Sequence, residues 1–576
     1  MTDAPQPGTS AVHRGTSKST PRRWKAWLAL VVAVVVLWLI VSGVSVFRVV
    51  RRLGAFAGTG PAVTISPETT HIVEPLRDDG YVDYLAALNQ RSRQGVTPEN
   101  NAAVLLWQAV GPAEIAGRYG EQDCGWFFRE LGVPRPPDDG EYFVPLRIYA
   151  SRIEGDPPAH QHGGPAEDEW HDPVGVGHAW ESILNEQFHQ AEGRPWSAEE
   201  FPHLAAWLEA NRGPLQLVVE GSTRQRFYSP LIPPRESPLL LNVLLPGAQG
   251  GRSMCDVLVA RAMLRLGEGK VDEAWHDLLA CHRWARLVAQ GPMFIEALIA
   301  NAIEGTACVG DAAVAHHGNL TSEQARRFRA DLRQLDPLPG VVAKIDVAER
   351  FAFLDTVTAM ARDGPAALVE DGASGEEPSW LETQLSKRGA RLLDWDAVLR
   401  MGNEHFDRLV KAGRIADRSE REEAVAQLDA EITQEANEVR DPMSLGKSLL
   451  STGPGKVVTE KIGQVFLALL GPSFSTAWQS EDRTRLTLQM AQVALALAAY
   501  RGDHGSYPDG LAQLVPEYLD EVPRDLFADG ELRYERDGED YVLYSVGPNG
   551  QDEEGRDHRG DPSGDDVAIR TSPPPE

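Results

Sequence analysis

The sequence predicts an α+β protein that is mainly α-helical, with one N-terminal transmembrane helix, a helical bundle and a small C-terminal module of a helix and an antiparallel sheet. Three observations support this fold class. An uncharged apolar run lies near the N-terminus. Apolar residues recur with helical spacing through residues 236–364. Near the C-terminus, a helical pattern is followed by two short stretches with strand-like alternation.

The charge of the chain excludes one class of partner. The 576 residues include 84 acidic and 56 basic ones and have a formal net charge of -28. Binding to nucleic acid requires a basic face that neutralises phosphates, and no basic stripe stands outside the N-terminus. We therefore expect no nucleic-acid partner.

The N-terminal region predicts a membrane anchor. Residues 1–20 are rich in Ser, Thr, Pro and Gly and are expected to be a disordered cytoplasmic tail. The 22 residues from Ala26 to Phe47 carry no charge. A helix of that length crosses about 30 Å of hydrocarbon. We place the transmembrane helix at residues 24–47.

A cleaved signal peptide is the alternative to an anchor, because Ala55-Phe56-Ala57 has the small-x-small pattern of a cleavage site. The apolar run is too long for a signal peptide, and three arginines separate it from that site. Five basic residues precede the run and three follow it, which favours a cytoplasmic N-terminus. The chain is thus predicted to be a single-pass protein of the inner (cytoplasmic) membrane with its bulk outside the cytoplasm.

Residues 59–235 form a mixed region rich in Pro and Gly. Residues 197–200 read Ser-Ala-Glu-Glu, which predicts the capped start of a helix. That helix carries Leu204, Trp207 and Leu208 at helical spacing.

A histidine-rich stretch lies within this region. Its histidines are His160, His162, His171, His178 and His189. Acidic residues lie among them, and imidazole and carboxylate are common metal ligands. The spacings match no established ligand pattern, so a polar loop is the favoured interpretation.

Residues 236–364 form the most helical part. A helix at 257–266, a turn containing two glycines and a helix at 271–288 predict a helical hairpin that resembles one tetratricopeptide unit. No second copy follows at a period of about 34 residues, so we expect a bundle with one such hairpin and not a solenoid. Thr321 and Gln324 have the spacing of a capping box.

The four cysteines are Cys124, Cys255, Cys281 and Cys308. None is part of a C-x-x-C pair, which excludes a zinc ribbon or a thioredoxin-like motif. Three of them fall in the helical part, where buried free thiols are expected. A disulfide in an extracytoplasmic domain stays open as an alternative.

Residues 365–480 are charged and weakly apolar and are predicted to be a helical connector.

Catalytic signatures are few along the whole chain. There is no H-E-x-x-H and no G-x-S-x-G. The sequence at 446–448 echoes a phosphate loop, but Asp441 stands where that motif requires glycine. Asp346 and Glu349 share one face of a helix expected at 341–361, and we interpret them as a solvated face.

The most position-specific pattern belongs to residues 481–550. It reads Tyr500-x4-Gly505-x-Tyr507-Pro508, then Pro523-x-Asp525, Leu532-x-Tyr534 and Tyr541-x-Leu543-Tyr544-Ser545-x-Gly547-x-Asn549-Gly550. This order of residues resembles the globular domain of the type II secretion major pseudopilin. The resemblance implies a long helix packed on a small antiparallel sheet. Apart from the resemblance, the alternation of residues in this pattern predicts two strands, at 531–535 and 540–546, that each turn one face toward the helix.

The resemblance also implies a calcium site. In that family the loop after the last strand binds calcium, and here residues 551–576 form an acidic loop and tail. The residues implied as ligands are Asn549, Asp552, Asp565 and Asp566. Oxygen-rich loops suit the coordination of calcium. A disordered acidic tail is the alternative, because Asn549 stands where the family usually has aspartate.

The chain departs from a pseudopilin in other ways. Its anchor lies far upstream of the module, no pilin leader is present, and Leu526 stands where the family usually has proline. Processing and polymerisation as a pilin subunit are therefore not expected. The whole layout also resembles large uncharacterised bacterial membrane-anchored proteins with such a module, which implies no activity.

Three functional hypotheses follow from the sequence. The leading one is a non-enzymatic, membrane-anchored envelope protein whose helical domain and module bind protein partners as a scaffold. Its rival is an extracytoplasmic metal-dependent hydrolase with a site in the histidine-rich stretch. In the third, the module is only a folding cap for the neighbouring helices.

Overall fold

The computed structural model describes residues 62–153, 175–234, 239–364, 393–440, 454–470, 474–557 and 563–571. The expected tail at 1–20 and the expected transmembrane helix at 24–47 lie outside these residues. The chain divides into two compact units, of which the larger comprises residues 63–359 and 394–576. The larger unit is mainly helical and carries a small antiparallel sheet near the C-terminus.

In its described residues, the region before the bundle contains helices joined by connecting loops. They are α3 (Tyr84–Ser92), α4 (Ala102–Val110), α5 (Ala113–Tyr119), α6 (Glu121–Glu130), α7 (Leu146–Ala150), α8 (Gly175–Gly193), α9 (Pro202–Ala210), α10 (Arg212–Gly221) and the 3-10 turn η1 (Leu240–Asn242). Asn101 ties this region together, because its side chain accepts from the amide of Ala103 at the start of α4 and exchanges two hydrogen bonds with the backbone of Tyr228.

The expected start of the helix after residue 197 is wrong by several residues. Ser197 accepts from the amide of Glu200 within a separate turn, and α9 begins only at Pro202. Proline favours the first helical position because its missing N–H has no partner there in any case. The apolar face was predicted correctly, since Leu204, Trp207 and Leu208 are buried in the core.

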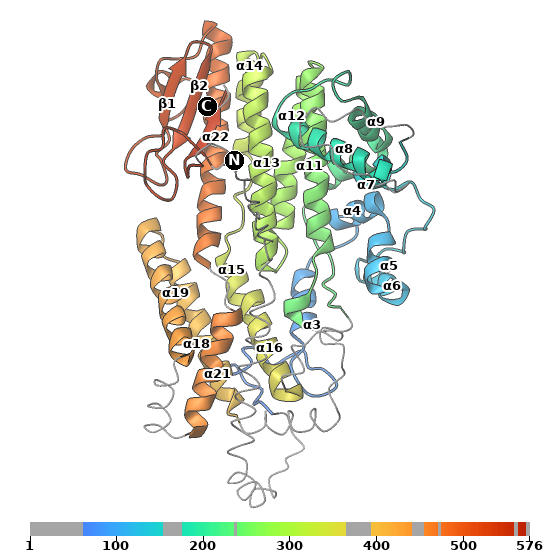
Figure 1. Ribbon diagram of the computed structural model, residues 1–576, viewed down its shortest axis with the longest axis vertical. Helices are drawn as coiled ribbons and strands as arrows, with labels where there is room; N and C mark the ends of the chain where they lie inside the picture. The colour runs from blue at the N-terminus through green and yellow to red at the C-terminus, as the bar shows by residue number, and fades with distance from the viewer. Residues whose placement is uncertain are drawn as a thin grey trace, which may run out of the picture. The chain divides into compact units, whose positions relative to one another are not determined.

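Five long helices form the centre of the unit. They are α11 (Pro246–Gly267), α12 (Val271–Val288), α13 (Phe294–His317), α14 (Ser322–Arg333) and α22 (Phe474–His504). Helix α13 packs against α11, α12 and α22, and α14 also packs against α22 (Figure 1). The predicted hairpin of α11 and α12 is confirmed, and α12 has the expected bounds, but α11 begins at Pro246 and not at residue 257. The predicted capping box of Thr321 and Gln324 is also confirmed.

The expected helix at 341–361 is present but not regular. It runs through α15 (Val342–Lys344), a π-helical turn η2 (Ile345–Glu349) and α16 (Arg350–Asp363). Such a turn inserts one extra residue and rotates the side chains that follow it. Three further helices, α18 (Trp395–Gly413), α19 (Arg418–Arg440) and α21 (Pro454–Leu470), pack against one another.

The C-terminal module is built on the end of α22. After the 3-10 turn η4 (Leu511–Leu514), strands β1 (Arg533–Asp537), β2 (Asp540–Ser545) and β3 (Val567–Arg570) form an antiparallel sheet in the order β1-β2-β3. Figure 1 shows this sheet lying beside α22. Of the residues predicted to face the helix, Leu532, Tyr541 and Leu543 are buried and Tyr534 is half-buried.

One hydrophobic core joins the module to the bundle. A single cluster of buried residues runs from α4 through α11–α14 and along α22 into the sheet. Its members in α22 include Leu486, Met490 and Val493, and its last member is Ile569 in β3. Because α22 contributes apolar residues to both neighbours, the module and the bundle share one interior.

One described helix, α13, is long and apolar enough to cross a membrane by length and composition alone. Most of that stretch is buried inside the protein. Among the described residues, α13 is therefore accounted for as the central helix of the bundle.

Candidate functional site

Among the described residues, a buried cluster of charged side chains lies between α12 and α13. The imidazole of His282 stands between two carboxylates, with Nδ1 at 3.0 Å from Glu304 and Nε2 at 2.9 Å from Asp311. Arg286 holds Glu304 through two bonds of 2.7 and 3.0 Å. The side chains of His282, Glu304 and Asp311 are completely buried. We call these residues, with Cys308, the buried polar cluster.

Helical spacing brings the cluster together. Glu304, Cys308 and Asp311 follow one another on α13 at intervals of four and three residues, so they occupy one face. His282 and Arg286 are four residues apart on the facing side of α12. The close packing of α12 on α13 then places the two rows opposite each other.

The cluster strongly perturbs the ionisation of its members. Burial lowers the pKa of His282, but Asp311 and Glu304 outweigh burial and raise it to about 10. Burial raises the pKa of Glu304, but His282 and Arg286 outweigh burial and lower it to about 2. The pKa of Asp311 is raised because burial outweighs its pairing with His282. An imidazolium, a guanidinium and two carboxylates balance to zero net charge, which makes their burial tolerable.

The contacts of the two carboxylates are unequal. Asp311 forms a hydrogen bond to Nε2, whereas Glu304 approaches Nδ1 without the alignment of a hydrogen bond. The second oxygen of Asp311, Oδ1, is buried and has no hydrogen-bond partner among the described residues.

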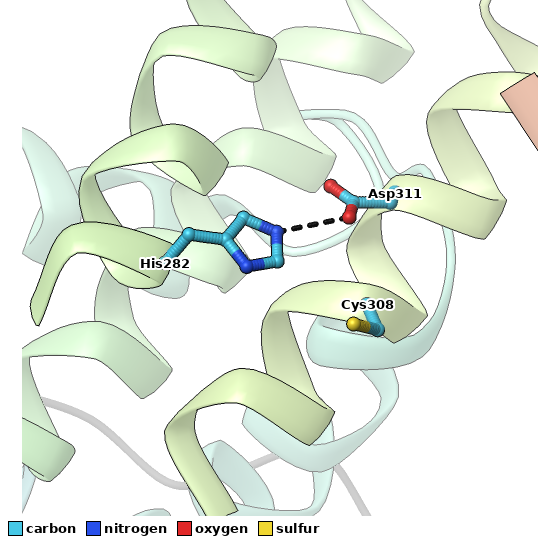
Figure 2. A group of neighbouring side chains, drawn as sticks. All are labelled: His282, Cys308 and Asp311. Carbon is cyan, nitrogen blue, oxygen red and sulfur yellow. Dashed lines mark hydrogen bonds and ion pairs between the residues drawn. The ribbon is translucent and has the colours of Figure 1, made fainter. Parts of the chain in front are cut away.

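Cys308 completes the cluster. Potential ligand atoms of His282, Cys308 and Asp311 all lie within 4.8 Å of one another. Figure 2 shows the cysteine sulfur and the aspartate carboxylate approaching the imidazole from the side remote from its own backbone. The thiol is protonated in this setting, because burial raises the pKa of Cys308 well above its usual value. All four cysteines of the chain are buried and free, as expected for those in the helical part.

This cluster was not predicted from the sequence. The only signal was the helical spacing of three polar residues within the apolar run of α13, which also fits a solvated stripe. Which helix faces that stripe depends on tertiary packing.

The residues implied as calcium ligands gather in one loop of the C-terminal module. Asp565 accepts from the amide of Asn549 at 2.9 Å and pairs with Arg483. Asp566 accepts from the amide of Gly555 at 2.7 Å and is almost fully buried. Asp552 pairs with Arg533 at 3.1 Å. These contacts shape the loop through protein groups alone.

The same loop differs from the alternative of a disordered acidic tail. Residues 563–571 are described, and β3 lies within them. In the described part of the chain, no three acidic side chains of this loop have oxygens as close together as the ligand atoms of the buried polar cluster. Calcium binding by the loop stays a prediction.

Most of the histidine-rich stretch falls outside the described residues. His160, His162 and His171 lie outside the described residues, and His189 is an exposed residue 3.6 Å from Glu192. The phosphate-loop echo at 446–448 also lies outside them.

The carboxylates of Asp346 and Glu349 point to different partners. Asp346 pairs with Arg350 at 2.8 Å, whereas Glu349 accepts from the amide of Phe294 at the start of α13. The interpretation of both residues as a solvated face is therefore wrong for Glu349, because burial raises the pKa of its carboxylate to about 7.

Comparison with known proteins adds no relative. No family model, no curated protein and no solved structure matches the chain.

Proposed function

We propose that this chain is a singly anchored protein of the bacterial envelope that acts as a non-enzymatic interaction scaffold. The anchor is the apolar run at residues 24–47, and the bulk of the chain lies outside the cytoplasm. The helical domain and the C-terminal module bind protein partners, beside a secretion apparatus.

The observation that carries this proposal is the shared core of bundle and module. Helix α22 packs against α13 and α14 and also against β2 and β3. Arg326 on α14 adds a polar contact, since its guanidinium lies 3.0 Å from Glu517 of the module and 4.5 Å over the ring of Tyr518. A module attached in this way presents its surface at a fixed position relative to the bundle, which reduces the entropic cost of binding a partner.

The resemblance to the pseudopilin globular domain enters the proposal at the level of fold. A long helix that leads into a three-stranded antiparallel sheet supports it. The left-handed backbone of Gly505, with φ of 77°, also supports it, because this glycine ends the helix at the position that the motif requires.

Membrane topology can be tested with introduced cysteines. The four native cysteines are buried, so an exposed cysteine is the reactive one. Arg212→Cys places a thiol where the native side chain is 75% exposed, and Thr9→Cys places one in the tail. In spheroplasts a membrane-impermeant maleimide is expected to label the first and to label the second only after lysis. The reverse pattern would overturn the proposed orientation.

The scaffold role can be tested by photo-crosslinking in living cells. A photoreactive residue replaces Glu535 on β1 or Glu323 on α14, both of which are exposed. We expect a discrete adduct, heavier than the chain, from at least one site. As the control, the same residue replaces Leu486 in the core, where no partner reaches. Absence of adducts from every exposed position would count against a scaffold.

A further inference from the structure

The buried polar cluster has the composition of a metal centre. Nitrogen, sulfur and carboxylate oxygen converge from His282, Cys308 and Asp311, with ligand atoms within 4.8 Å of one another. Around one zinc ion these atoms lie at about 2.0–2.3 Å from the metal, and therefore at roughly 3–4 Å from one another. Small rotations of three side chains bring the observed separations into that range.

The surroundings of His282 match the outer shell of a metal-bound histidine. A metal-bound imidazole generally donates its other N–H to a carboxylate, which fixes the ring and its tautomer. Here Nε2 is hydrogen-bonded to Asp311, and Nδ1 lies 3.0 Å from the Glu304 carboxylate, at hydrogen-bonding distance but without the alignment of a hydrogen bond. Glu304 is itself held by Arg286 through both of its oxygens. This arrangement leaves Nε2 as the ligand atom and assigns Glu304 an orienting role.

A second, independent observation is the oxygen Oδ1 of Asp311. It is buried without a hydrogen-bond partner among the described residues, although a buried polar atom left in this way is costly. A carboxylate that chelates a metal uses both oxygens. Asp311 would then supply two donor atoms beside one nitrogen and one sulfur, which completes a four-donor shell without water.

We propose that His282, Cys308 and Asp311 bind one divalent transition-metal ion of the zinc class, which fastens α12 to α13. Mixed imidazole, thiolate and carboxylate ligands favour zinc over magnesium or calcium. The ion replaces one proton on His282 and one on Cys308. Two positive charges enter and two protons leave, so the cluster stays neutral overall in both forms.

The alternative is an ion-pair network that never holds a metal. The two differ in the role of the thiol. In a metal-free network Cys308 only fills space, whereas in the metal centre its sulfur is a ligand. Cys124 offers a matched control, because it is also a free, fully buried cysteine but lies on α6 outside the cluster.

The test uses the full-length protein, purified in detergent with a tag that contains no histidine. Cells are grown in minimal medium in which either Zn²⁺ or Co²⁺ is the supplied metal. We expect about one ion per chain after dialysis, as for a structural site. The cobalt form is expected to show sulfur-to-cobalt charge-transfer absorption in the near ultraviolet and d–d bands in the visible.

Substitutions locate the ion. Cys308→Ala should abolish the charge-transfer band, and Cys124→Ala should leave both band and stoichiometry unchanged. Glu304→Gln should keep the band and weaken metal affinity by about 10–100-fold, as expected for an orienting carboxylate. Circular dichroism verifies that each variant is folded.

Two results would overturn the proposal. One is a wild-type protein that retains neither zinc nor cobalt from either medium. The other is a charge-transfer band that persists in folded Cys308→Ala, which would place the ion elsewhere. If Cys308→Ala does not fold, Glu304→Gln decides, because unchanged affinity in that variant also contradicts the proposed site.

Discussion

At the scale of single residues, the hydrogen bonds of Asp525 explain part of the sequence pattern of the C-terminal module. Asp525 is 5% exposed, and its carboxylate accepts from the amide of Phe527 at 2.8 Å and from the hydroxyl of Ser545 at 2.6 Å. It therefore fastens the loop before β1 to the end of β2. Ser545 and Asp525 both belong to the pattern recognised in the sequence, and the hydrogen bond between them explains why the two occur together.

Removal of this carboxylate should destabilise the protein. Asp525→Ala leaves the buried amide of Phe527 and the hydroxyl of Ser545 without their acceptor, and we expect the free energy of unfolding to fall by about 2–4 kcal/mol. The exposed Asp529 provides a control, for which alanine should change stability by less than about 0.5 kcal/mol. Denaturant unfolding measures both, and equal effects would contradict the role assigned to Asp525.

Glu349 should make stability depend on pH. Burial raises its pKa from 4.5 to about 7. The folded state then retains a proton that the unfolded state has lost, so this residue lowers stability as pH rises from 4.5 to about 7. Glutamine cannot ionise. Glu349→Gln should therefore gain stability relative to wild type between pH 5 and pH 8, by about 1–3 kcal/mol.

Urea unfolding at the two pH values tests this prediction. Glu296, whose pKa burial also raises to about 7, is unchanged in the variant, so it cancels in the comparison. Glu323→Gln, at an exposed position on α14, is the control. A stability difference that stays constant with pH would contradict the buried, protonated state of Glu349.

Individual residues were predicted unevenly from the sequence. Burial of Leu204, Trp207 and Leu543 followed from periodicity, because a core face repeats with its helix or strand. The burial of the Glu349 carboxylate was not predicted, because a π-helical turn between α15 and α16 changes the helical spacing on which a common solvated face with Asp346 depended. The buried polar cluster also could not be predicted, since it depends on which face of α12 meets α13.

At the scale of elements, local signals found the helix and the first two strands of the module but misplaced their ends. The module was expected from residue 481, but its long helix, α22, begins at Phe474. Strand β1 was expected at 531–535 but is formed by Arg533–Asp537. Glu531 and Leu532 pair instead with the segment at 523–524, so the sheet begins after them.

Strand β3 was missed altogether. Its four residues, Val567–Arg570, follow acidic residues and pair with β2 across an intervening loop. A strand this short has almost no periodic signal, and its partner is distant in sequence. Only the tertiary structure distinguishes it from an acidic tail.

Two glycines of the module should respond differently to alanine. Both have positive φ, 77° for Gly505 and 65° for Gly547. A Cβ on Gly505 meets no atom within 4 Å, whereas a Cβ on Gly547 would lie 2.0 Å from the carbonyl oxygen of Asp565. Gly505→Ala should cost about 1–2 kcal/mol for the left-handed backbone alone, and Gly547→Ala should cost clearly more.

Thermal unfolding of the two variants measures this difference. The backbone at Asp565 must move to accommodate the new methyl group, which would disturb the start of β3. Equal losses of stability at the two glycines would contradict the close approach of these two backbone segments.

At the scale of the whole molecule, the main finding is the continuous core. The sequence divides the chain into a helical domain, a charged connector and a module, because local periodicity carries no information about which faces meet. In the structure, buried residues of α22 belong to the same cluster as those of α13 and α14. The hypothesis of a folding cap and that of a scaffold are therefore compatible, since a rigid surface requires such a cap.

Deletion of residues 484–576 should unfold the bundle. The truncated chain exposes the faces of α13 and α14 that pack against α22. The free energy lost when so large an apolar surface is no longer buried exceeds the free energy of unfolding of a typical domain. Circular dichroism and limited proteolysis of membrane preparations should show loss of the folded helices. Deletion of 572–576, which lie outside the described residues, serves as the control. A truncated chain with a protease-resistant bundle would contradict the shared core.

We conclude that bundle and module form one rigid unit, and native-state hydrogen exchange of the full-length protein tests this claim. The slowest amides of α13 and those of β2 should exchange with the same free energy of opening and the same dependence on denaturant, because both require global unfolding. Exchange of β2 through a separate opening of much lower free energy, while α13 stays protected, would contradict the claim and describe an independent module on a tether.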